Sequence, residues 1–202
     1  MTQTNIHIPS LGNRNTFTRT LSIDDLKSCV IVESAFTEQE RCSEEKFRYR
    51  LSSCPDLCLG LFLDNDNEKP PTLIGHVIAV RSPYTRVTDG SMSMPENWES
   101  LPNDEPVFVD GELIGNHKYG DSIAIHSVAI SPDYQGKRVG RALVSAYTRH
   151  LEKGSFGASR AVLIAHDYLV HFYESVGFKN LGLSKSSFAG GFGMICHMSF
   201  EL

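Results

Sequence analysis

The stretch VAISPDYQGKRVGRALVSAY, residues 128–147, constrains the fold more than any other part of the sequence. A strand of small and β-branched residues stops at Ser131-Pro132, and apolar residues at helical spacing begin at Val139. Two glycines and three basic residues occupy the junction: Gly136, Gly140, Lys137, Arg138 and Arg141. The first-turn amides of a helix lack intrahelical partners, so a phosphate binds there when no side chain blocks it. The junction predicts a pyrophosphate site; the alternative is a strand-to-helix turn with a solvated basic edge.

The pattern of the remaining chain predicts an α/β fold with a mixed sheet in one domain, residues 16–202. The first half contains a strand at 16–21, helices at 22–36 and 43–54, and a hairpin of the strands 57–63 and 72–80. The second half alternates strands at 122–130, 160–165 and 193–200 with helices at 138–153 and 169–176, which predicts a parallel crossover. Residues 1–15 are expected to form a mobile tail. Residues 83–120 lack periodicity and are expected to be a long functional loop or insertion.

Composition excludes several classes of function. The net charge is −5, with 24 acidic and 19 basic residues, which argues against nonspecific nucleic-acid binding. The apolar runs fall short of the roughly 18 residues that cross a bilayer, and the polar N-terminus predicts a cytoplasmic protein without membrane association. Five cysteines without a CxxC pair predict reduced thiols. The histidines show no metal-ligand spacing, so no metal is expected, and a monomer is favoured.

Residues Gln135 to Gly140, QGKRVG, resemble the acetyl-CoA signature of the GNAT N-acetyltransferases. VLIAHDYLVHFYESVGF, residues 162–178, resembles the later motif of the same family, in which a helix with a tyrosine follows a strand. SSCPDLCLGLF, IHSVAI and GMICHMSF resemble segments of arylalkylamine (serotonin) N-acetyltransferases, and the fungal polyamine N-acetyltransferases are closer still. The resemblance covers about residues 17–200. It implies a GNAT fold, with a mostly antiparallel sheet flanked by helices and splayed parallel strands that form an acetyl-CoA cleft.

The resemblance also implies where acetyl-CoA binds. Backbone groups along the central strand would hold the pantetheine arm: Val128, Ala129 and Ile130. The junction would hold the pyrophosphate: Gln135, Gly136, Lys137, Arg138, Val139, Gly140 and Arg141. The amine would enter beside a substrate loop, with one further residue on the far wall: Cys54, Pro55, Asp56, Leu57 and Phe188. Cys54 is interpreted as a packing or loop thiol and not as a nucleophile.

By position in the family pattern, His126 is the candidate general base, directly or through water, and Tyr173 is the candidate general acid. From the residues alone, a hydrogen-bonded strand histidine and a core tyrosine are the competing interpretations. Alternative bases lie in the first-helix region, where a solvated acidic face is the competing interpretation: Glu33, Glu38 and Glu40. The sequence departs from the family at Arg138, where the signature has glycine. It also departs at Ala124, where the vertebrate enzymes have a second histidine.

The predicted function is therefore acetyl-CoA-dependent N-acetylation of a small primary amine, a polyamine or an arylalkylamine, by direct transfer. Two alternatives remain open at this point: acetylation of a protein amino group, and a non-catalytic acetyl-CoA-binding sensor.

Overall fold

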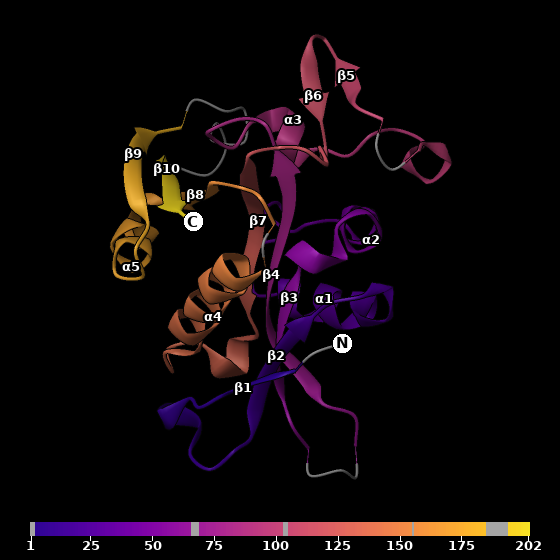
Figure 1. Ribbon diagram of the computed structural model, residues 1–202. Helices are drawn as coiled ribbons and strands as arrows, with labels where there is room; N and C mark the ends of the chain where they lie inside the picture. Colours follow the sequence, from indigo (N-terminus) through magenta and orange to yellow (C-terminus); the bar gives the residue numbers. More distant parts are fainter. Residues whose placement is uncertain (1–2, 66–68, 103–104, 155, 185–193) are drawn as a thin grey trace. The chain divides into compact units, whose positions relative to one another are not determined.

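The computed structural model describes residues 3–65, 69–102, 105–154, 156–184 and 194–202, which form an α/β fold (Figure 1). Two compact units can be distinguished, Met1–Ile78 with Ser127–His150, and Ala79–His126 with Leu151–Leu202. Three elements run from one unit into the other: β4 (Thr72–Ser82), β7 (Ser122–Ile130) and α4 (Val139–Lys153).

The sheet of the first unit has the strand order β1 (Thr4–Ile6), β2 (Thr16–Thr20), β3 (Leu59–Leu63), β4 and β7. β1 pairs with β2, β2 with β3 and β3 with β4, all antiparallel. The hairpin predicted from residues 57–80 is thus confirmed, with Leu63 opposite Thr72 at its closed end.

Helices cover both faces of this sheet (Figure 1). Ser22 caps a 3-10 turn, Ile23–Asp25, which leads into α1 (Leu26–Glu33), and Ser43 caps α2 (Glu44–Ser53) through the amide of Lys46. His76 on β4 faces α1 and α2, whereas a side chain at the neighbouring Gly75 would meet Leu143 of α4. Because adjacent residues of a strand point to opposite faces, α1 and α2 lie on one face and α4 on the other.

The core of the first unit fills the space between its strands and the α1–α2 face. Phe17 on β2 stacks on Phe62 of β3, with ring centroids 5.4 Å apart. Residues from the other elements of this cluster are buried around them: Leu21, Leu26, Cys29, Val32, Phe47, Leu51, Cys58, Leu73, Ile78 and Ala129. This packing holds β7 in the sheet, and the candidate site begins at the end of that strand.

The second unit carries the parallel strand pair. β7 pairs in parallel with β8 (Arg160–His166), and β8 continues antiparallel to β10 (Ile195–Glu201) and β9 (Lys179–Leu183). The parallel register joins Ser122 to Arg160 through Ala124 to Val162, while β7 continues to Ile130. The short helix α5 (Val170–Glu174) follows β8. A mixed, mostly antiparallel sheet flanked by helices was predicted, and it is confirmed.

Two segments differ from the sequence-based expectation. Residues 1–15 were expected to form a tail, but Thr4–Ile6 form β1, Pro9–Leu11 form a 3-10 turn, and Ile8 is buried. An apolar side chain with a sheet edge beside it gains by packing, and this outweighs the polar composition of the segment. Residues 83–120 contain α3 (Asp89–Met92), a 3-10 turn (Trp98–Ser100) and a hairpin of β5 (Val107–Val109) and β6 (Glu112–Ile114).

No helix among the described residues is long and apolar enough to cross a membrane.

Candidate functional site

The strand-to-helix junction has the backbone of an anion-binding turn. β7 ends at Ile130, a 3-10 turn follows at Pro132–Tyr134, and α4 begins at Val139. Gly136 has φ +69°, and a side chain there would meet no heavy atom within 4 Å. Val139 is buried and anchors α4 in the core, so the amides of the first turn keep a fixed direction. Gly136 therefore leaves open space in front of the helix N-terminus, as a phosphate group requires.

Arg138 stands at the position where the family signature has glycine, and it adopts φ +58°. This left-handed conformation costs a non-glycine residue about 1–2 kcal/mol, which explains why glycine suits the position. The carbonyl of Arg138 accepts the first hydrogen bond of α4, from the amide of Ala142 at 3.2 Å. Arg138 is thus the residue before the helix, and the amides of residues 139–141 have no intrahelical acceptor.

The other polar side chains of the junction shape its rim. Lys137 Nζ donates to the carbonyl of Asp133 at 2.7 Å and lies 5.8 Å from the centre of the Tyr134 ring. Gln135 Nε2 donates to the carbonyl of Ile130 at 3.1 Å, so its side chain closes the end of β7. Gln135 was predicted to contact the pyrophosphate, and in this structure its side chain amide is turned back to the strand.

The residues predicted to hold the pantetheine arm alternate in exposure. Val128 and Ile130 are half-buried, and Ala129 is part of the core of the first unit. The parallel register with β8 includes Ser122, Ile123 and Ala124, and the three predicted residues follow later on the same strand.

The candidate acid and base both belong to the second unit. Tyr173 lies on α5, and its ring packs edge-on against Phe172 and Phe178 at centroid distances of 5.0 and 5.6 Å. Burial raises the pKa of Tyr173 above its ordinary value, so the hydroxyl keeps its proton at neutral pH. His126 on β7 is half-buried, and its Nδ1 faces the thioether sulfur of Met92 at the end of α3. The segment 83–120 thus contributes a residue beside the candidate base.

The predicted substrate loop is held against α4. Tyr147 donates its hydroxyl to the carbonyl of Leu57 at 2.9 Å, and a ring nitrogen of His150 lies 2.8 Å from the carbonyl of Asp56. Pro55 and Leu57 bound a 3-10 turn directly after α2. Two loop carbonyls are therefore fixed by side chains of one helix. Phe188, the last predicted substrate residue, lies outside the described residues.

Cys54 is buried, and its Sγ lies 3.4 Å from the carbonyl of Arg50. The hydrogen bond to Cys58 and burial raise the pKa of Cys54 well above its ordinary value. Such a thiol is not a nucleophile at neutral pH, in agreement with its interpretation as a packing residue.

A buried polar cluster in the first unit was not predicted. Glu33 Oε2 lies 3.0 Å from His76 Nε2 and accepts a hydrogen bond from Ser127 Oγ at 2.7 Å. Glu33 Oε1 accepts from the amide of Cys42 at 2.9 Å. Burial alone would raise the pKa of Glu33, but the hydrogen bond and charge of His76, together with the Cys42 and Ser127 donors, lower it. Glu33 is thus ionised and buried, contrary to the expectation of a solvated acidic face.

This cluster does not have the geometry of a Ser–His–carboxylate triad. In a Ser–His–carboxylate triad, the serine gives its proton to one imidazole nitrogen and the carboxylate accepts from the other. Here Ser127 and Glu33 both lie against Nε2 of His76, at 3.1 and 3.0 Å, and Ser127 donates directly to Glu33. The sequence carried two signals: Glu33 stands at helical spacing from the apolar Leu26 and Cys29, and His76 stands inside an apolar strand.

The glutamates proposed as further alternative bases lie outside this cluster. Glu38 is exposed, and Glu40 accepts a hydrogen bond from Thr37 Oγ1 at 2.8 Å. No group of three or more metal-ligating side chains is present among the described residues.

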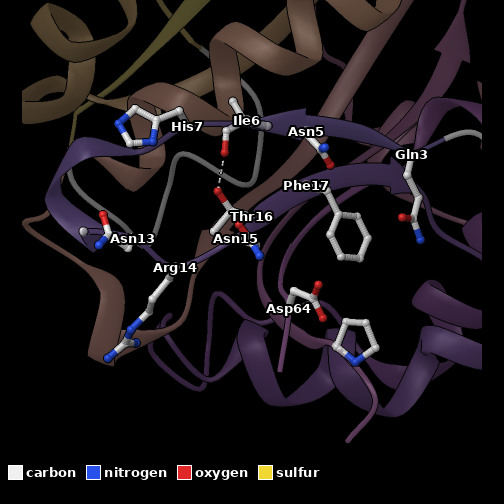
Figure 2. Close-up of a pocket in the computed structure, with 12 residues that line it drawn as sticks. Gln3, Asn5, Ile6, His7, Asn13, Arg14, Asn15, Thr16, Phe17 and Asp64 are labelled. Atoms are coloured by element: carbon white, nitrogen blue, oxygen red, sulfur yellow. Dashed lines mark hydrogen bonds between the residues drawn. The ribbon is translucent and has the colours of Figure 1, made fainter. Parts of the chain in front are cut away.

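Two cavities border the first unit's N-terminal segment. One, of about 780 Å³, lies between β1, the turn that follows it and Phe17, with Asp64 on its far side (Figure 2). No predicted site residue lines this cavity. The second, of about 370 Å³, is lined by the junction itself, by α4 and by residues 7–10.

Residues 103–199 match the family of acetyltransferase (GNAT) domains, a span that includes His126, the junction and Tyr173. Solved structures of other proteins align with nearly the whole chain. The loading GNATL domain of CurA from Lyngbya majuscula covers 92% of it, with 97% of that domain matched, a TM-score of 0.65 and 14% identity. The chain has the GNAT fold.

Two further GNAT structures have the same architecture at low identity. PaiA N-acetyltransferase from Thermoplasma acidophilum, in complex with coenzyme A, covers 93% of the chain, with 99% of its own length matched, a TM-score of 0.55 and 18% identity. The ribosomal-protein-S18-alanine N-acetyltransferase from Escherichia coli covers 92%, with 93% of its own length matched, a TM-score of 0.54 and 17% identity. Among curated protein sequences, none matches the chain significantly. These GNAT relatives therefore establish the fold and leave the acceptor open.

Proposed function

We propose that this protein is a GNAT acetyltransferase that transfers the acetyl group of acetyl-CoA to a small primary amine. The amine nitrogen bonds to the thioester carbonyl carbon and the carbon–sulfur bond breaks. The amine loses a proton to a base, and the coenzyme leaves as a thiolate that takes up a proton. No covalent enzyme intermediate is required, in keeping with the buried, protonated state of Cys54.

The single observation that supports coenzyme binding is the junction at the start of α4. Gly136 leaves open space beside the first turn of α4, Arg138 before the helix is left-handed, and Lys137 and Arg141 line the same cavity. Because the amides of that turn and the helix dipole attract negative charge, the residues fit the pyrophosphate of coenzyme A. Acetyl-CoA, when bound, supplies an activated acetyl thioester.

Deprotonating the amine is a larger energetic problem for the enzyme than stabilising the leaving thiolate. A primary amine has a pKa of about 10.4, so roughly one molecule in a few thousand is unprotonated at pH 7. Removing that proton before attack is worth about 4–5 kcal/mol of barrier. His126, half-buried on β7, is the proposed base, acting directly or through water.

Tyr173 is the proposed partner of the leaving thiolate. A thiol titrates at about 8.5 and a tyrosine at about 10, so complete proton transfer from tyrosine to thiolate is uphill by about 2 kcal/mol. Burial raises the pKa of Tyr173 further and increases this gap. Tyr173 therefore acts by donating a hydrogen bond that stabilises the thiolate, and solvent completes the protonation.

A polyamine or an arylalkylamine is the proposed acceptor. The resemblance of residues 52–62, 125–130 and 193–200 to arylalkylamine and polyamine enzymes supports this class, and the net charge of −5 favours a cationic amine.

Thiol release from acetyl-CoA, measured with spermine, putrescine, tryptamine, phenylethylamine and a lysine peptide, tests the proposal. Turnover with one of the small amines is expected. Turnover with the peptide alone would assign the protein to amino-group acetylation of polypeptides. Tight acetyl-CoA binding without any turnover would assign it to coenzyme sensing. In the His126→Ala variant the pH–rate profile is expected to shift to higher pH; an unmoved profile would exclude His126 as the base.

A further inference from the structure

The cavity of about 370 Å³ at the junction has a wall that the GNAT signature does not include. On one side it is lined by the junction and α4: Gly136, Lys137, Arg138, Arg141, Ala142 and Ser145. On the other side it is lined by the N-terminal wall, which we define as His7, Ile8, Pro9 and Ser10. All of these residues belong to the first unit.

The N-terminal wall is fixed at both of its ends. The preceding residue, Ile6, pairs with Thr16 of β2, and the side chain of Ile8 is 3% exposed. At the far end, Ser10 Oγ donates a hydrogen bond to the carbonyl of Lys137. The wall is therefore tied both to the sheet and to the loop that carries the pyrophosphate-binding amides.

The lining combines two chemical characters. Pro9, Ile8 and Ala142 offer apolar surface, and the cavity falls at the small end of the ~300–1,000 Å³ range of ligand pockets. Three cationic side chains lie on the opposite side, and no Asp or Glu is present among the described residues that line the cavity. A flat apolar group that carries phosphates fits this combination, as in a purine nucleotide.

We propose that the N-terminal wall binds the nucleotide end of coenzyme A against α4. The inference rests on the proposed function for its ligand. The inference goes beyond the proposed function because it assigns recognition of the adenosine phosphate half of coenzyme A to residues 7–10, which lie far in sequence from the signature. The chain then distinguishes the complete coenzyme from acyl carriers that lack a nucleotide.

Two variants test the wall. Ser10→Ala removes the hydrogen bond to Lys137, and Ile8→Ala removes the buried anchor. Thr4→Ala, an exposed β1 residue that does not line the cavity, is the matched control. Thermal unfolding of each variant serves as the control that the domain remains folded.

Kinetics with two thioesters give the first readout. For Ser10→Ala we expect KM for acetyl-CoA to rise roughly two- to tenfold, the range for loss of one hydrogen bond, with a larger rise for Ile8→Ala. KM for S-acetyl-N-acetylcysteamine, which has no nucleotide, is expected to stay within twofold of the wild-type value. An equal rise with both thioesters, or an unchanged KM for acetyl-CoA, would overturn the inference.

Titration with adenosine 3′,5′-bisphosphate gives a second readout that needs no turnover. We expect the wild type and Thr4→Ala to bind this nucleotide equally and both wall variants to bind it more weakly. If the protein acetylates no amine but this pattern holds, the proposed function fails and the nucleotide site stands. If acetylation occurs and the wall variants bind the nucleotide as the wild type does, the inference fails and the function stands.

Discussion

Replacing His76 with phenylalanine tests whether the buried Glu33 depends on its imidazole partner. The phenyl ring keeps the edge-on contact with Phe47, now at 5.4 Å, but removes the donor 3.0 Å from Glu33 Oε2. Glu33 retains one donor on each oxygen, Ser127 Oγ and the Cys42 amide. Loss of a hydrogen bond to a charged group costs about 1.5–3 kcal/mol, and breaking a buried ion pair costs about 3–5 kcal/mol. Because two donors remain, we expect a loss of about 2–3 kcal/mol.

Urea unfolding at pH 7 measures this loss, with equal m-values as the sign that both proteins unfold in the same way. His171→Phe on the exposed face of α5 is the control, with an expected change below about 0.5 kcal/mol. The double variant Glu33→Gln, His76→Phe is expected to recover about 1 kcal/mol relative to His76→Phe, because the buried charge is removed.

The pH dependence separates charge from packing. In the wild type the pKa of Glu33 is lowered, so its contribution is complete above the ordinary glutamate value of about 4.3 and is lost as the pH falls through the folded-state pKa. In His76→Phe the main lowering partner is absent and burial raises the pKa, so the penalty shrinks as the pH falls toward 5. A stability difference that stays constant from pH 5 to pH 8 would refute the reasoning.

Three other substitutions address the proposed coenzyme and catalytic residues. Tyr173→Phe keeps the ring packing against Phe172 and Phe178 but removes the hydroxyl. We expect kcat to fall roughly 10- to 100-fold, with little change in acetyl-CoA affinity. An unchanged kcat in a steady-state assay would remove Tyr173 from the mechanism. Arg138→Gly relieves the left-handed backbone at φ +58° and should raise the free energy of unfolding by about 1 kcal/mol, as measured in urea, whereas a loss of stability means that the arginine side chain matters more than its backbone. Cys54→Ala should retain turnover, because its thiol is buried and protonated; loss of activity in a variant that still melts cooperatively argues for a covalent route.

The junction was predictable because its chemistry is local. A strand of small residues, a Ser-Pro stop, glycines and a helical stripe lie within twenty residues, and each acts on the backbone beside it. The sequence also indicated that Arg138 departs from a glycine pattern, and the structure gives the reason, a left-handed φ at that position.

The buried cluster was harder to predict than the junction, because it forms only through long-range packing between three elements. Glu33, His76 and Ser127 come from α1, β4 and β7, and a glutamate side chain is usually solvated. The N-terminal strand was not predicted for a related reason. β1 is only three residues long, and pairing with β2 stabilises its extended conformation.

Incubation with acetyl-CoA labelled in the acetyl group, followed by mass spectrometry of amine and protein, tests the central claim most directly. The proposed direct transfer predicts label on a small primary amine such as spermine or tryptamine and none on the protein. Label that remains on acetyl-CoA with every amine, or that accumulates on Cys54, would contradict it.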